Sequence, residues 1–150
     1  MKLVDVSFIT VRSKINVFID GASSGNPGPA GCGVVIIEGQ TIREISCFIG
    51  RATNNVAEYM ALIIALEELK GKVDCDIIIS SDSELIVRQM EGQYKVKDSV
   101  LSFLYQRAKR LWRNHYSLVH IPRERNELAD ALARRAIKLA HLVEQGGRLS

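Results

Sequence analysis

Four acidic residues lie at positions where a carboxylate could do chemistry. Asp20 and Asp82 each follow a short β-branched run that is typical of a buried strand. Glu58 and Asp130 lie on two segments of helical periodicity, where they lean toward the apolar face. Each acid alone is as well explained by a turn, a cap or the seam of a helix. Four carboxylates meeting at one point, however, could not all ionise without cations.

A cluster of this kind offers only oxygen ligands, which favours hard ions such as Mg²⁺, with Mn²⁺ as a possible substitute. Two such ions about 4 Å apart can activate a water and stabilise the leaving oxygen of a phosphodiester. The four acids therefore favour a nuclease that binds two metal ions.

The order of strand and helix patterns predicts an α/β fold with a five-stranded mixed sheet. Three strands joined by short turns form an antiparallel meander, and helical crossovers make the two later strands parallel to the first. Helices are expected on both faces, and sites in such folds lie outside the carboxyl ends of the parallel strands. The expected strands cover residues 15–20, 32–38, 41–49, 76–80 and 116–121, and the expected helices cover 54–69, 83–90, 96–114 and 126–143.

The length of 150 residues predicts one catalytic domain, at residues 15–143. Residues 1–14 form an N-terminal extension or an edge strand, and residues 144–150 a flexible C-terminal tail. Between the first two strands, the Gly-, Ser- and Pro-rich run at 21–31 predicts a tight, exposed turn. Asn126 is expected to cap the last helix.

The composition, 47% hydrophobic and 25% charged, is that of an ordinary globular protein. No apolar run is long enough for a membrane span, and an early acid, Asp5, argues against a secretory signal. We therefore expect a cytoplasmic location, with a monomer as the simplest state. The three cysteines fit neither a disulfide framework nor a metal site, which predicts core packing.

The net charge of +3 is unevenly distributed along the chain. Residues 88–125 hold nine Lys or Arg and three acids. A basic half facing an acid cluster suits an anionic polymer held near bound metal, although a solvated helix face would have the same composition.

The four acids stand in motifs that resemble those of the type 1 ribonuclease H family, over roughly residues 15–140. The first motif is DGASSGNPGP at 20–29, and the second is TNNVAE at 53–58. The third is SDS at 81–83, and the fourth is NELAD at 126–130. All four stand in the family's order, each on the element that the family's pattern requires.

The resemblance implies a ribonuclease H-like fold and an endonuclease that hydrolyses the RNA strand of RNA–DNA hybrids with two Mg²⁺, leaving a 5′-phosphate and a 3′-hydroxyl. The four acids would be the metal ligands. Contacts to the minor groove, where 2′-hydroxyls distinguish RNA, are implied for Gly21, Ala22, Asn26 and Asn55. A pocket for a DNA-strand phosphate is implied for Thr53 and Asn54, which helix capping explains equally well.

The chain departs from the family's pattern near the last acid. Many members carry a mobile His in that loop, whereas residues 122–125 read Pro-Arg-Glu-Arg. Arg123 resembles the arginine of a subgroup, and we assign it the auxiliary catalytic role. His120 is an alternative, although its apolar strand favours a core or rim histidine. Glu84 stands where the family often has Gln, which leaves its minor-groove contact open.

The long basic protrusion of some members is also absent. Substrate binding would then depend on Lys95 and Lys97 and on the basic face of the following helix. A solvated surface explains these basic residues equally well.

Three alternative functions remain: cleavage of a wider range of duplexes, including RNA–RNA, an integrase-like strand transferase, and a hybrid-binding module without catalysis. The first fits arginine-bearing relatives, the second lacks support because integrases use another acid pattern, and the third is disfavoured because no acid is missing.

Overall fold

The structure is a computed structural model that describes residues 12–149. Most of the predicted N-terminal extension or edge strand therefore lies outside the described residues. Ser13 and Lys14, which the prediction assigned to that segment, belong to the first strand of the sheet.

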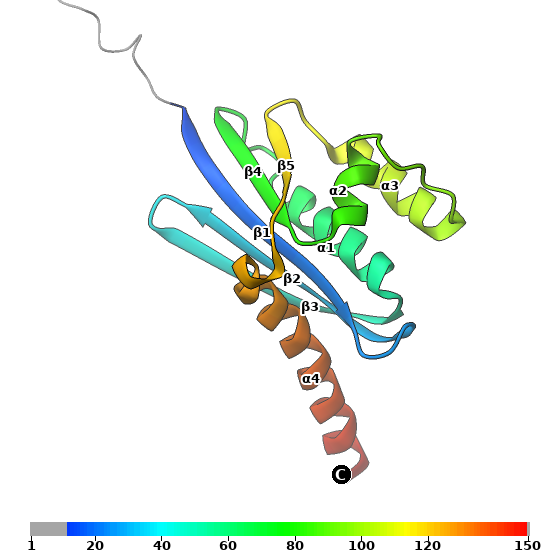
Figure 1. The fold of residues 1–150 in the computed structure, drawn as a ribbon. Helices are drawn as coiled ribbons and strands as arrows, with labels where there is room; N and C mark the ends of the chain where they lie inside the picture. The colour runs from blue at the N-terminus through cyan, green and yellow to red at the C-terminus, as the bar shows by residue number, and fades with distance from the viewer. Residues whose placement is uncertain (1–11, 150) are drawn as a thin grey trace, which may run out of the picture.

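The sheet has five strands in the order β3-β2-β1-β4-β5 (Figure 1). β1, β2 and β3 pair antiparallel, whereas β4 pairs parallel to β1 and β5 parallel to β4. The predicted fold class is thus confirmed. The strands span Ser13–Ser23 (β1), Gly28–Glu38 (β2), Thr41–Ala52 (β3), Cys75–Ser81 (β4) and Tyr116–His120 (β5).

Helices cover both faces of this sheet, as predicted. They span Asn54–Glu68 (α1), Glu84–Met90 (α2), Ser99–Leu111 (α3) and Glu127–Leu149 (α4). On one face, the Cys32 thiol lies 3.4 Å from the carbonyl oxygen of Ala57 in α1. On the other face, the Ser46 hydroxyl donates to the Leu132 carbonyl of α4 at 2.6 Å. Figure 1 shows α4 crossing the sheet alone, opposite α1 and α3.

The main core lies between the sheet and α1, with α3 closing its outer side. Side chains such as Val17, Ile19, Leu62, Leu66 and Ile79 are fully buried there. Burial of each of these side chains stabilises the fold by roughly 1.5–3 kcal/mol, so β1, β4 and α1 form a rigid layer that positions Asp20, Asp82 and Glu58. Among residues 12–149, no helix is long and apolar enough to cross a membrane.

α4 lies unusually close to the sheet because β2 presents glycines to it. A Cβ on Gly33 would overlap the carbonyl oxygen of Ala129, and one on Gly31 would overlap that of Ala133. Small residues on both sides therefore let the helix backbone approach the strand backbone. The prediction of a tight, exposed turn over the whole run 21–31 is wrong in its extent, since β1 continues to Ser23 and β2 begins at Gly28.

Two helix boundaries also differ from the prediction. α3 is shorter, because the Asp98 side chain accepts from the Leu101 amide at 2.9 Å and starts the helix there. α4 continues to Leu149, past the predicted end at 143 and through most of the predicted flexible tail. A glycine inside a helix costs only about 1 kcal/mol relative to alanine, so the glycines at 146 and 147 do not end it.

The close approach of α4 to β2 predicts a large difference between two Gly→Ala substitutions. Gly33→Ala should lower the free energy of unfolding by about 2–3 kcal/mol, because the new methyl group displaces the backbone of α4. Gly146→Ala is the matched control, since no atom outside the adjacent part of its own helix lies within 4 Å of its Cβ position. It should be neutral or stabilise by up to about 1 kcal/mol. Urea unfolding of both variants measures this, and equal values would contradict the packing described here.

Candidate metal centre

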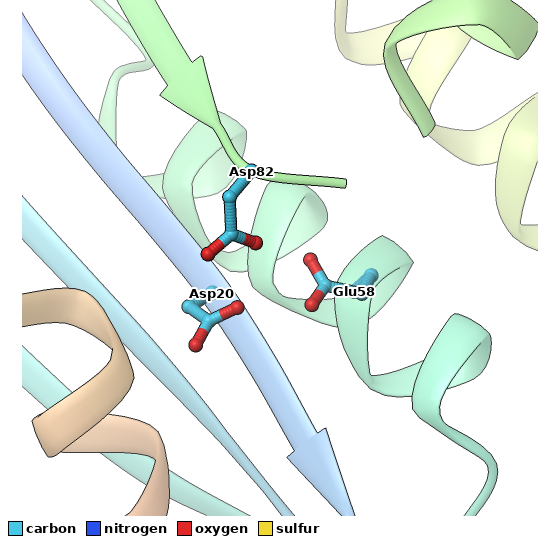
Figure 2. Close-up of side chains that lie close together, drawn as sticks. All are labelled: Asp20, Glu58 and Asp82. Atoms are coloured by element: carbon cyan, nitrogen blue, oxygen red, sulfur yellow. The ribbon is translucent and has the colours of Figure 1, made fainter. Parts of the chain in front are cut away.

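Three of the four predicted acids converge at one end of the sheet (Figure 2). Asp20 comes from β1, Glu58 from α1, and Asp82 directly follows β4. One carboxylate oxygen of each lies within 4.8 Å of the others. Asp20 and Glu58 are 5% and 8% exposed, so two of these carboxylates are buried beside each other.

The convergence follows from where β4 ends. The parallel pairing of β1 and β4 stops at Ile19 and Ser81, and β1 continues beyond it. Asp20 and Asp82 are the next residues on the two strands, so both side chains lie at the opening that the end of β4 leaves. Sites in open α/β sheets occur at such carboxyl ends.

Hydrogen bonds hold the elements that carry Glu58 and Asp82. The Thr53 hydroxyl accepts from the Val56 amide at 3.2 Å and caps α1 one turn before Glu58. The Tyr59 hydroxyl donates to the buried Gln89 side chain at 2.6 Å, which joins α1 to α2. Next to Asp82, the Ser83 amide donates to the Ser81 hydroxyl at 3.0 Å.

Burial and mutual repulsion make the ionised form of these three carboxylates energetically unfavourable unless a cation is bound. Burial raises the pKa of Asp20 from about 3.8 to about 7, and the Asp82 carboxylate contributes in the same direction. Burial also raises the pKa of Glu58 well above its ordinary value, with a further contribution from the charge of Asp20. The two carboxyls thus favour a shared proton over two negative charges near neutral pH.

The donor set fits a divalent cation. The Oε2 atom of Glu58 is buried and has no hydrogen-bond partner among the described residues. An unpartnered buried carboxylate oxygen is unfavourable unless a cation or a proton satisfies it. Three carboxylates and no nitrogen or sulfur ligand suit Mg²⁺ or Mn²⁺ better than zinc.

Asp130, the fourth predicted acid, lines the same cleft but lies outside the group of three. Its Oδ1 atom accepts from the Arg134 guanidinium, one turn further along α4, at 3.0 Å. Asp130 is close enough to contribute to the raised pKa of Asp20. The start of α4 is fixed to β1, because the side-chain Nδ2 of Asn126 donates to the Ile19 carbonyl at 2.8 Å. Asn126 does not cap α4 with its side chain, since its Oδ1 has no partner among the described residues.

The acids lie in an open cleft of about 940 Å³ that includes most of the predicted site. Nine predicted residues line it: Asp20, Gly21, Ala22, Asn54, Asn55, Glu58, Asp82, Arg123 and Asp130. Five predicted substrate-binding residues do not: Asn26, Thr53, Glu84, Lys95 and Lys97. The Glu84 carboxylate lies 3.7 Å from the Arg88 guanidinium on the same helix. His120 ends β5, is exposed and does not line the cleft, so it is not a core histidine.

The turn between β1 and β2 is tied to the start of α1. The Asn54 amide donates to the Asn26 side chain, and the Asn54 side chain accepts from the amide and hydroxyl of Ser23, each at 3.0 Å. Helix capping, the structural alternative for both residues, therefore holds for Thr53, whereas Asn54 anchors the turn and does not cap α1.

Sequence reasoning missed the part of the cleft that α4 supplies. Arg134, Lys138 and His141 line it beyond Asp130. Three other lining residues were also missed: Phe48 of β3, Ser23 at the end of β1, and Ser24 of the turn that follows. The signal was present in the sequence, since the three basic residues follow Asp130 at helical spacing.

Comparisons with known proteins agree with this geometry. Residues 18–136 match the family model described as reverse transcriptase-like. A ribonuclease H of Prosthecochloris aestuarii is 36% identical, over 85% of this chain and 98% of that protein. Ribonuclease HI of Halobacterium salinarum is 42% identical over 83% of this chain. The chain spans 64% of the length of that relative and 36% of a mycobacterial bifunctional protein that it also matches.

Among solved structures, LC11-RNase H1 from compost superposes with a TM-score of 0.80 and 47% identity, over 85% of this chain and 98% of that one. The same protein solved in complex with an RNA/DNA hybrid gives a TM-score of 0.79 and covers 84% of this chain and 98% of that one.

The raised pKa of Asp20 predicts how stability depends on pH without metal. A carboxyl whose pKa is higher in the folded state adds stability that is complete below about pH 4 and is lost as the pH rises through about 7. In EDTA, Asp20→Asn should therefore gain stability over the parent as the pH rises from 5 to 8, by on the order of 2 kcal/mol. Urea unfolding across this range measures the gain.

Asp74→Asn is the control for this series, because Asp74 is an exposed acid outside the cleft. Its difference from the parent should not change with pH. A difference for Asp20→Asn that is equally flat would contradict the described environment of the carboxyl.

Proposed function

Since the chain belongs to the ribonuclease H family, we propose that it is a metal-dependent endonuclease that hydrolyses the RNA strand of RNA–DNA hybrids. The observation that carries this proposal is the group of three carboxylates, two of them buried, at the floor of an open cleft. Such a group is unfavourable in a structural role and is suited to holding cations next to a bound phosphodiester.

Asp20, Glu58 and Asp82 would hold the metal, and Asp130 would complete the set once its carboxylate leaves Arg134. When bound, two Mg²⁺ ions would supply the positive charge that activates a water and stabilises the leaving oxygen. The oxygen of water attacks the phosphorus atom and gives up a proton to solvent, and the bond from phosphorus to the 3′ oxygen breaks. The leaving oxygen takes up a proton, which gives a 3′-hydroxyl and a 5′-phosphate.

We assign the auxiliary role to Arg123. It begins the 3₁₀ turn Arg123–Arg125 and lines the cleft together with the acids. A guanidinium there can bind a non-bridging phosphate oxygen and stabilise the charge that develops in the transition state.

Substrate recognition would use the wall of the cleft beside the β1–β2 turn. The backbone of Gly21 and Ala22 lines the cleft together with the acids, and Asn55 is exposed at the start of α1. Backbone amides and a short amide side chain suit the shallow minor groove of a hybrid, where 2′-hydroxyls identify the RNA strand. The capture of an RNA/DNA hybrid by LC11-RNase H1 supports this choice of substrate. Asn26, Glu84, Lys95 and Lys97 would contact the duplex only outside the cleft.

The remaining assignments belong to the same proposal. Mg²⁺ is the expected ion, with Mn²⁺ as a substitute, and the RNA–RNA duplex is the alternative substrate. A monomer suffices, since the acids come from one chain. A cytoplasmic location suits the three free thiols, which persist in a reducing compartment.

The proposal predicts Mg²⁺-dependent cleavage of a labelled RNA–DNA hybrid. EDTA should abolish the cleavage, and Asp82→Asn should reduce it by about 10²-fold or more, because one ligand carboxylate is lost. Asp74→Asn should behave like the parent. An RNA–RNA duplex and single-stranded RNA, tested in parallel, rank the substrates. Tight hybrid binding without cleavage in either Mg²⁺ or Mn²⁺ would leave only a binding module.

Arg123 and Arg125 give a matched pair for the auxiliary role. Arg123→Ala should lower kcat by about 10–100-fold with a smaller change in KM, since its charge acts mainly on the transition state. Arg125→Ala removes the same charge from the same turn but outside the cleft, and it should leave kcat within about twofold of the parent. If the two variants lose activity equally, Arg123 has no auxiliary role.

A further inference from the structure

The exposed face of α4 continues the cleft beyond the acids. Arg134, Lys138 and His141 line the cleft on this helix, together with Asp130. At 100° per residue, these four side chains lie within about 80° of one another around the helix. With 1.5 Å of rise per residue, the row extends about 16 Å along the helix from Asp130 to His141.

The basic residues of this row are available for a ligand to different degrees. The Arg134 guanidinium is occupied by Asp130 at 3.0 Å, in a pair whose arginine side chain is mostly exposed, so the pair is weak. Lys138 and His141 form no ion pair with any described residue. Lys138 is exposed, and a freely solvated ammonium ion at the wall of a cleft can bind a phosphate without first breaking another contact.

The position of the row argues against a merely solvated helix face. Arg135 directly follows Arg134 in the sequence and is exposed as well, but it does not line the cleft. The cations on the cleft side stand in line with Asp130 and line the same cleft as the acids at which a phosphodiester would be cut. Glu144 lines the cleft beyond His141, and its negative charge sets the far limit of a surface for polyanions.

We propose that this face of α4, with Lys138 at its centre, binds backbone phosphates of the duplex next to the cleaved bond. The inference rests on the proposed function, which it extends by naming a surface that holds the substrate. A nucleic-acid strand carries one phosphate per nucleotide, so a row of this length faces several successive phosphates. Such contacts are independent of base sequence and depend strongly on salt.

The test compares Lys138→Glu with Arg135→Glu, which make the same charge change on the same helix, inside and outside the cleft. Both are made in the Asp82→Asn background, so that binding is measured without cleavage. Fluorescence anisotropy with a labelled RNA–DNA hybrid and Mg²⁺ should show a roughly tenfold higher Kd for Lys138→Glu. Arg135→Glu should change Kd by less than about twofold.

A milder variant, Lys138→Gln, guards against a folding defect and gives a second readout. It should lower the slope of log Kd against log salt by about one, the value expected for one lost phosphate contact. With Asp82 intact, Lys138→Gln should raise KM and leave kcat within about twofold, because the lysine binds substrate and transition state equally.

The outcomes separate the two proposals. If the parent cleaves the hybrid and the Lys138 and Arg135 variants have equal Kd values, the phosphate-binding surface is contradicted and the proposed function stands. A parent that binds the hybrid through Lys138 but does not cleave it would overturn the proposed function and leave the surface in place. An unchanged salt slope in Lys138→Gln would show that the lysine makes no phosphate contact.

Discussion

The repulsion among Asp20, Glu58 and Asp82 is the constraint on which the rest of the structure depends. Each unit of pKa shift corresponds to about 1.4 kcal/mol, and both buried carboxyls are shifted upward. A protein with a net stability of about 5–15 kcal/mol can hold such a cluster only if the surrounding elements cannot move apart. Bound cations would remove this cost, which is a physical reason for a metal centre to be built at this point.

The elements around the cluster meet that requirement in different ways. β1 is held between β2 and β4 in the middle of the sheet, so Asp20 cannot retreat into solvent without disrupting the sheet. α1 packs its apolar face on the core and is joined to α2 through Tyr59 and Gln89. Asp82 has more freedom because it follows the last residue of β4, and it is half-buried rather than buried. Of the three acids, Asp82 is thus the one that lies nearest the solvent.

The sequence was informative where the acids were considered together, since each of them alone has more than one physical explanation. A β-branched run followed by an acid located Asp20 and Asp82, and an acid on an apolar helix face located Glu58. It was ambiguous where two explanations need the same residue. Glycine serves both tight turns and close backbone packing, so the run at 21–31 was interpreted as a turn although Gly31 lies in β2 against α4. The position of Asp130 relative to the other acids, and its pairing with Arg134, depend on how α4 docks, which local sequence does not encode.

The docking of α4 also connects the metal centre to the surface proposed for phosphates. Gly31 and Gly33 let the helix lie against β2, and the Asn126 side chain ties its start to the Ile19 carbonyl, one residue before Asp20. Any side chain larger than hydrogen at those two glycines would push the helix outward. Asp130 would then move away from the other acids, and Lys138 would move with it because both belong to one rigid helix. The same two glycines therefore determine how close Asp130 comes to the other three acids. They also determine how far from the cleaved phosphodiester Lys138 can contact the nucleic-acid backbone.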